Sequence, residues 1–416
     1  MGGPLPVVNR DQLPLVFHEP HVYTGFRPLH QPWKNYVLSL FQWHNEVMNV
    51  WTHLLALVVV VIRAAIWSLE FDLVLDPYMW PLAVGIATII VLYTCSSCAH
   101  CFSNRSELTH YTCFMCDYAG IGLYGFGSTI LHYWYCLHED FLGTLSHQLA
   151  TPVGAFLGVL TCVCCSISKT KYKRPYPFIR RVWQMSSVLA IYLWLIFPIW
   201  YKIWLYVHDG EWESSFRHHL QQMLWFTMGG FFFGTDIPQR FYPGKFDLLG
   251  HSHQLFHVCI FMTTFEQMNA IYLEMTDGIH LVRRMEAPTL LNTWGAFWFV
   301  VLANAAVVYY FHTKVMARLE IESLKKQDGD GIKTCDDVDM LTAANSTEGQ
   351  GNGIGLIDDG KDSSAYVTGN DKKFDKNNVH PENDINSPNK RVHDGGKMEE
   401  SQCLNNHNGC KLTIRS

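Results

Sequence analysis

The stretch Gly250-His251-Ser252-His253-Gln254-Leu255-Phe256-His257 carries three histidines and opens a long apolar run. His253 and His257 are four residues apart, so on a helix they lie on one face, one turn above the other. A helix presents two imidazoles to a single metal ion in this way. Such a pair also occurs in helices where both rings are only hydrogen-bonded, and the pair alone does not separate the two interpretations.

An earlier stretch, Ser96-Ser97-Cys98-Ala99-His100, closes another apolar run. Ser96 and His100 are four residues apart at the end of a predicted membrane helix, where polar groups are costly unless they are used. A third imidazole from His100 would complete a facial three-histidine metal site with His253 and His257.

The composition indicates a membrane protein with a polar tail. Hydrophobic residues make up 49% of the chain and charged residues only 16%, which is low for a globular protein. Residues 327–416 carry 16 acidic and 10 basic residues and account for the whole net charge of −6. The remainder is neutral, so we expect no nucleic-acid partner.

Residues 1–33 lack the apolar core of a signal peptide, and the first membrane helix is expected to direct insertion.

Eight stretches are long and apolar enough to cross a bilayer, which takes about 20 residues. The sixth is the weakest, because Gly229, Gly230 and Gly234 interrupt it. The eight predicted spans are residues 48–69, 78–101, 111–135, 149–168, 183–205, 219–236, 250–273 and 290–312. The sequence therefore predicts an all-α integral membrane protein with a seven-helix bundle and an eighth, C-terminal transmembrane helix.

The basic residues of the loops predict the orientation. Loop 169–181 carries Lys169, Lys171, Lys173, Arg174, Arg180 and Arg181, and lysine and arginine concentrate on the cytosolic side. This places the N-terminus in the cytosol. We expect a cytosolic N-terminal segment over residues 1–47, a multipass domain over 48–313 and a cytosolic, mostly disordered tail over 314–416. Residues 327–416 hold few apolar side chains to offset the loss of chain entropy.

With this orientation, polar residues from four helices fall at one level, near the cytosolic face. The span 78–101 ends there with Ser96 and His100, and the span 250–273 begins there with His253 and His257. The span 111–135 also begins there and places Asp117 at the same depth. The start of the first span adds Glu46, Asn49 and His53, which share one helical face and form a structural polar cluster. This coincidence favours the metal-site interpretation over scattered, hydrogen-bonded histidines.

Other intramembrane features have simpler interpretations. Arg63 either pairs with a carboxylate such as Glu266 or reaches an interface. Glu266 and Gln267 either line a ligand cavity or satisfy Arg63. The 13 cysteines lie mostly in apolar runs, so we expect packing residues and no disulfide framework. Gly120, Gly122, Gly125 and Gly127 are expected to let helices approach closely.

The sequence resembles the progestin and adipoQ receptor family, and its membrane progestin receptor branch in particular. The matching motifs are His44-Asn45-Glu46-Val47-Met48-Asn49-Val50-Trp51-Thr52-His53, Ser96-x3-His100, Asp117-Tyr118-x-Gly120, Ser252-His253-Gln254-Leu255-Phe256-His257, Tyr23-Thr24-Gly25-Phe26-Arg27-Pro28 and Arg174-Pro175-Tyr176-Pro177. These motifs extend over nearly all of residues 18–320, and the tail lies outside the resemblance.

The resemblance implies zinc bound by His100, His253 and His257, with Asp117 holding a zinc-bound water and Ser96 assisting. It also implies progestin binding at the plasma membrane and a cytosolic transducer such as a G protein. Relatives are associated with zinc-dependent hydrolysis of lipid amides such as ceramides.

The residues themselves are compatible with two functions. In a receptor, zinc would hold helices together around an apolar cavity for a steroid or another lipid. In an amide hydrolase, Asp117 would act as general base and Ser96 would donate to the oxyanion. A transporter is a weaker third interpretation, because no repeat is evident.

Overall fold

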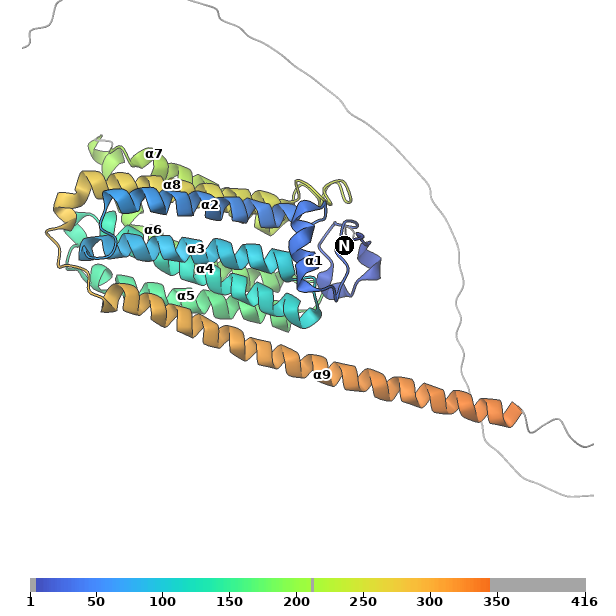
Figure 1. Cartoon of the computed structure of the whole chain (residues 1–416). Helices are drawn as coiled ribbons and strands as arrows, with labels where there is room; N and C mark the ends of the chain where they lie inside the picture. Colours follow the sequence, from blue (N-terminus) through green and yellow to red (C-terminus); the bar gives the residue numbers. More distant parts are fainter. Residues whose placement is uncertain (1–4, 211–212, 345–416) are drawn as a thin grey trace, which may run out of the picture. The chain divides into compact units, whose positions relative to one another are not determined.

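The computed structural model describes residues 5–210 and 213–344. Within these ranges eight long helices run alongside one another as a bundle (Figure 1). They are α2 (Val47–Glu70), α3 (Trp80–Phe102), α4 (Glu107–Tyr135), α5 (Leu145–Lys171), α6 (Phe178–Asp209), α7 (Phe216–Thr235), α8 (Ser252–Val282) and α9 (Ala296–Ala344). Each matches one of the eight predicted spans, so the all-α bundle with an eighth C-terminal helix is confirmed.

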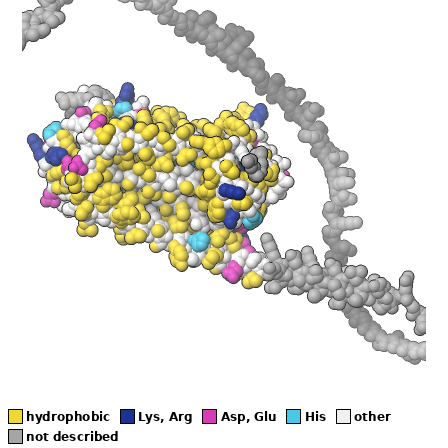
Figure 2. All heavy atoms as spheres, in the orientation of Figure 1, with side chains coloured by type: hydrophobic (Ala, Val, Ile, Leu, Met, Phe, Trp, Pro, Cys, Tyr) yellow, Lys and Arg dark blue, Asp and Glu magenta, His cyan; other side chains and the backbone are white. Residues whose placement is uncertain are grey.

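The surface of the bundle is that of a membrane protein. Five stretches of the described chain are long and apolar enough to cross a bilayer, and they contain α2, α3, α5, α6 and the first part of α9. Figure 2 shows apolar side chains covering the middle of the visible face, while charged groups gather toward the two ends. Helices α4, α7 and α8 are more polar, and they turn many of these polar side chains inward.

The segment before α2 folds over one end of the bundle, which we call the N-terminal end (Figure 1). It contains η1 (Arg10–Gln12), η2 (Leu15–Phe17), α1 (Trp33–Leu38) and η3 (Ser39–Phe41). Its own small core buries Leu13, Phe17, Val22 and Phe26. The carboxylate of Asp247, just before α8, accepts hydrogen bonds from the backbone amides of Tyr23 and Thr24 at 3.2 and 2.8 Å. This contact ties the segment to the start of α8.

The connection between α3 and α4 brings two predicted site helices together at the same end. Residues 103–106 form the whole link, and the Ser106 hydroxyl accepts a hydrogen bond from the Thr109 amide, which caps the first turn of α4. The end of α3 and the starts of α2, α4 and α8 therefore all lie at the N-terminal end (Figure 1). This is the common level that the sequence predicts.

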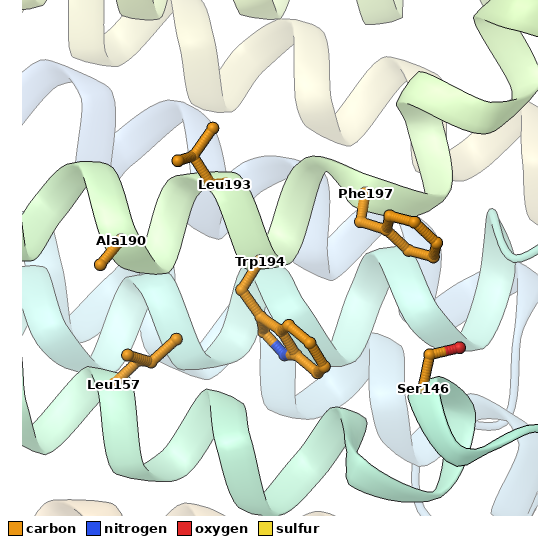
Figure 3. Close-up of a pocket in the computed structure, with 6 residues that line it drawn as sticks. All are labelled: Ser146, Leu157, Ala190, Leu193, Trp194 and Phe197. Carbon is orange, nitrogen blue, oxygen red and sulfur yellow. The ribbon is translucent and has the colours of Figure 1, made fainter.

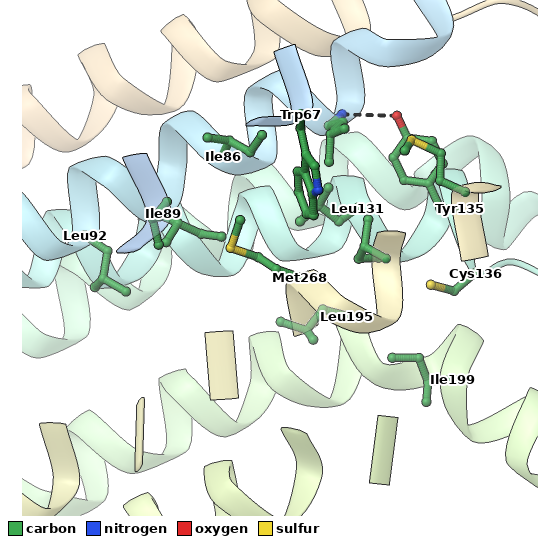
Figure 4. Packing of buried hydrophobic residues seen from close by; sticks show 14 of the residues in the cluster. Trp67, Ile86, Ile89, Leu92, Leu131, Tyr135, Cys136, Leu195, Ile199 and Met268 are labelled. Atoms are coloured by element: carbon green, nitrogen blue, oxygen red, sulfur yellow. Dashed lines mark hydrogen bonds between the residues drawn. The ribbon is translucent and has the colours of Figure 1, made fainter. Parts of the chain in front are cut away.

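The interior of the bundle is packed by apolar side chains from α2, α3, α4, α6 and α8. The main cluster includes Trp67, Ile86, Leu131, Leu195 and Met268, whose side chains point toward one another in Figure 4. Between helices in a bilayer, close packing rather than water exclusion supplies most of the attraction. This cluster fixes the spacing of the helices that carry the polar site.

The glycines of α4 let it approach its neighbours, as predicted. A Cβ at Gly122 would collide with the backbone of Gly158 in α5, and one at Gly127 would collide with Thr88 in α3. Because α4 also packs against α6, α8 and α9, it is the central helix of the bundle.

Helix α9 packs against α4 and α5 and then continues well past the expected end of the ordered chain. Asn304 donates a hydrogen bond to the Ala119 carbonyl, and Arg318 donates one to the Thr170 carbonyl. The mostly disordered tail stays a prediction, although α9 is helical as far as Ala344. Adding residues to an established helix costs far less than starting one, so a polar sequence can extend it. The rest of the tail, residues 345–416, lies outside the described residues.

The contact between α4 and α5 makes a prediction for stability. Gly122→Ala is expected to destabilise the bundle by about 1–3 kcal/mol, because its methyl group meets backbone that cannot yield. Gly230→Ala in α7 is the matched control, since a Cβ there meets nothing within 4 Å. Thermal unfolding of the purified variants in detergent measures both changes. Equal melting temperatures for the two variants would contradict the close contact.

His44, just before α2, makes a prediction for pH dependence. Burial, together with the charge of Arg27, lowers the pKa of His44 to about 3, and its Nδ1 accepts a hydrogen bond from the Glu46 amide. The unfolded chain then binds a proton that the folded chain does not, so stability falls by up to about 1.4 kcal/mol per unit as pH drops below about 6.5. His44→Asn keeps an acceptor and is expected to flatten this slope between pH 7 and 5 in thermal melts. An unchanged slope would show that His44 is not the group responsible.

Candidate functional site

Three histidines from two helices meet at the N-terminal end of the bundle. One ring nitrogen each from His100 in α3 and from His253 and His257 in α8 lies within 4.8 Å of the other two. The Nε2 atoms of His100 and His253 are 3.2 Å apart. His100 and His257 are buried, whereas His253 is partly accessible. The geometry therefore brings together the three residues predicted to bind a metal.

The remaining ring nitrogens of His100 and His257 are held by α2. The Nδ1 of His100 lies 2.8 Å from the Glu46 carboxylate, and the Nδ1 of His257 lies 3.1 Å from the Asn49 carbonyl. Both partners are acceptors, so each Nδ1 carries the proton and each Nε2 keeps its lone pair. A carboxylate or carbonyl behind a histidine is the usual support of a metal ligand. The donor set thus fits a divalent metal of the zinc class.

The predicted polar cluster of Glu46, Asn49 and His53 lies directly behind these ligands. The Asn49 amide donates to the Glu46 carboxylate at 2.7 Å and fixes its direction. The His53 ring stacks on the His257 ring with centroids 3.7 Å apart, and its Nδ1 is 2.8 Å from the Ser96 hydroxyl. All three residues are buried and support the histidines without joining the triad.

Asp117 in α4 lies at the level that the sequence predicts. Its carboxylate is buried and lies near the Ser96 hydroxyl. It is not one of the three grouped ligands. A carboxylate at this depth of the bundle can accept a proton or orient a polar group. The Ser96 hydroxyl lies 2.8 Å from the Nδ1 of His53 and near Asp117, so it lies between α2 and α4.

Sequence reasoning did not find Arg27, although it noted the motif that contains it. The Arg27 guanidinium is 1% exposed and donates to the carbonyls of His100 and Cys101, both at 2.7 Å. These are carbonyls of the last turn of α3, so Arg27 closes the helix end that carries His100. An arginine in a polar segment ahead of the first span gives no sign that it is buried, and only the fold places it.

The residues predicted to line a ligand cavity have partners on several helices. Glu266 lies 2.6 Å from the Nδ1 of His218, and its suggested pairing with Arg63 stays a prediction. Arg63 lies over the rings of Trp67 and Phe265 at 4.9 and 5.3 Å. An aromatic face supplies a partner for a guanidinium within the membrane. The sequence shows that Arg63 is charged, but it does not show whether a carboxylate or an aromatic ring faces the guanidinium.

Gln267 is held by hydrogen bonds between helices. Its amide oxygen accepts from Tyr124 at 3.0 Å, and its amide nitrogen donates to the Nε2 of His132, also at 3.0 Å.

A cavity of about 370 Å³ lies elsewhere, between α5 and α6 (Figure 3). Its lining residues, which include none of the predicted three, are Ser146, Leu157, Ala190, Leu193, Trp194 and Phe197. It is mostly apolar, with the Ser146 hydroxyl at one side (Figure 3).

The cysteines agree with the sequence prediction. Cys101, Cys136, Cys162 and Cys165 are buried among the helices, and the cysteines of the described side chains are free thiols. These four buried cysteines act as small packing residues in this part of the chain.

Comparison with known proteins identifies the family. The haemolysin-III-related family matches residues 41–268, which include the whole triad. Similar proteins include membrane progestin receptor beta of Homo sapiens, 33% identical over 75% of this chain and 88% of its own length. Membrane progestin receptor alpha of Homo sapiens is 34% identical over 76% of this chain and 91% of its own length. Membrane progestin receptor alpha-B of Danio rerio is 31% identical over 74% of this chain and 87% of its own length. The chain is thus an all-α membrane protein that belongs to the haemolysin-III-related family, among the progestin and adipoQ receptors.

Proposed function

We propose that this chain is a membrane steroid receptor that binds progestins, acts at the plasma membrane and holds one zinc ion at His100, His253 and His257. The observation that carries the zinc proposal is the convergence of three imidazoles of which two have Nδ1 fixed by an acceptor. The names of the similar proteins support the choice of ligand class.

Zinc, when bound, would join α3 to α8 and could polarise a carbonyl group or activate a water molecule at an open coordination position. The chain's own residues prepare this place. Glu46 keeps the proton of His100 on Nδ1, and the Asn49 carbonyl does the same for His257. Asp117 supplies a buried carboxylate near Ser96 at the same end of the bundle, where it can orient a polar group.

The receptor mechanism requires a lipid ligand to bind two helix arrangements with different affinities. The bundle offers an apolar cavity between α5 and α6 for a ligand that arrives through the bilayer. A role for Arg63, Glu266 and Gln267 in ligand binding stays a prediction. With a cytosolic N-terminus, the N-terminal end of the bundle would face a transducer such as a G protein. The exposed basic residue Lys173 lies in a loop at this end.

A first experiment tests zinc and steroid binding together. The purified full-length protein is expected to contain about one zinc per chain by elemental analysis and to bind a radiolabelled progestin. His253→Ala removes one of three ligands and is expected to lose most of the zinc. His280→Ala, an exposed histidine near the end of the same helix, is the matched control and should retain it.

The two parts of the proposal fail separately. Zinc that stays at full occupancy in His253→Ala would refute the three-histidine site. A zinc-loaded, folded protein that binds no progestin would refute the steroid receptor and leave the metal site standing.

A second candidate function is zinc-dependent hydrolysis of lipid amides, and the position of Asp117 favours it. The buried carboxylate lies near the Ser96 hydroxyl at the end of the bundle that holds the imidazoles, which suits a general base with a hydroxyl donor nearby. The carboxylate could take a proton from water and deliver it to the leaving amine.

Asp117→Asn tests this second candidate. The variant keeps the size of the side chain but cannot accept a proton, so ceramide turnover is expected to fall by about 10²–10⁴-fold. Zinc content and progestin binding should remain. Turnover is measured with a fluorescent ceramide in detergent micelles, with His280→Ala as the control. Absence of turnover in the unmodified protein, or equal turnover in Asp117→Asn, would exclude the hydrolase role of Asp117.

A further inference from the structure

A second group of metal-binding side chains lies at the other end of the bundle, away from the three histidines. It consists of Cys136, which follows α4, His219 near the start of α7 and Glu274 toward the end of α8. One ligand atom from each lies within 4.8 Å of the other two. The three residues are 0%, 1% and 5% exposed. The proposed receptor site uses none of them.

The hydrogen bonds of His219 suit a metal ligand. Its Nε2 lies 2.9 Å from an oxygen of Glu274, and its Nδ1 lies 2.8 Å from the side-chain amide of Gln222. The amide group can turn so that its oxygen accepts a proton from Nδ1, because both orientations occupy the same volume. Nε2 is then free to bind a cation between His219 and Glu274, and Gln222 supports the ring from behind.

The charges of the surroundings also favour a cation. The ammonium group of Lys202 lies 2.5 Å from one oxygen of Glu274 and 3.1 Å from Glu213, so one positive charge faces two carboxylates. A divalent ion that binds with loss of the Cys136 proton adds one net positive charge. With a neutral imidazole at His219, the formal charges of Lys202, Glu213 and Glu274 sum to −1 without the ion, and the ion with the Cys136 thiolate brings this sum to zero. Ser215 donates to Glu274 at 2.8 Å and holds the oxygen that faces His219.

We propose that Cys136, His219 and Glu274 bind a second divalent metal ion of the zinc class. A thiolate with an imidazole selects zinc, cobalt or cadmium over magnesium and calcium, which prefer oxygen ligands. On binding, the Cys136 thiol releases its proton to solvent and the sulfur coordinates the ion. The ion joins the ends of α4, α7 and α8. In the predicted orientation this end faces outside the cell, so the ligand class is extracellular zinc.

The test uses the full-length protein in detergent, stripped of metal by a chelator and titrated with Co²⁺. The tail residues Cys335, Cys403 and Cys410 are changed to serine in every sample, because they could also bind cobalt. A sulfur ligand produces a thiolate-to-cobalt charge-transfer band in the near ultraviolet. The three-histidine centre contains no sulfur, so the band does not come from that centre, and the Cys136→Ser variant decides whether Cys136 is the sulfur ligand.

Cys136→Ser is expected to remove the band and to lower the bound Co²⁺ by one equivalent. Cys162→Ser, which changes another fully buried cysteine in α5, is the matched control and should keep both. Thermal melting verifies that each variant is folded. If Cys136→Ser does not fold, His219→Gln takes its place, and the Co²⁺ affinity read from the band should fall at least tenfold.

Two results would overturn the proposal. One is a folded protein that shows no charge-transfer band, which would leave the group as an ion pair and hydrogen-bond network only. The other is a band of full strength in Cys136→Ser, which would place the sulfur ligand elsewhere.

Discussion

The carboxylate of Glu46 organises the site at the N-terminal end. It accepts from the Nδ1 of His100 and from the Asn49 amide, so one buried charge orients a ring on α3 and a side chain on its own helix. Asn49 in turn offers its carbonyl to His257 on α8. A buried carboxylate is tolerated only with such partners. The helices α2, α3 and α8 are therefore held in one register by polar contacts as well as by packing.

Much of this arrangement follows from the sequence. Eight apolar runs predict the eight helices, and the alternating directions of the helices place His100, His253 and Asp117 at one end. Helical spacing also predicts the shared face of Glu46, Asn49 and His53. Apolar length, helix direction and helical spacing are properties of single helices and of their order along the chain, so they can be predicted from the sequence.

Other features depend on contacts between helices and could not be predicted. Arg27 is distant in sequence from the α3 carbonyls that it binds, and Glu266 has His218 of another helix as a partner. The group of Cys136, His219 and Glu274 joins three separate parts of the chain with no common spacing. Helix α9 reaches Ala344, because a helix that already exists can continue through polar sequence.

The glycine contact between α4 and α5 limits how the bundle can rearrange. Gly122 and Gly158 place backbone against backbone, so α4 cannot slide along or rotate against α5 without a collision. Helices α7 and α8 also meet each other extensively, and α8 is held to α2 and α3 through its two histidines. The α4–α5 pair is thus a rigid unit, and in any rearrangement of the bundle these two helices have to travel together as one body.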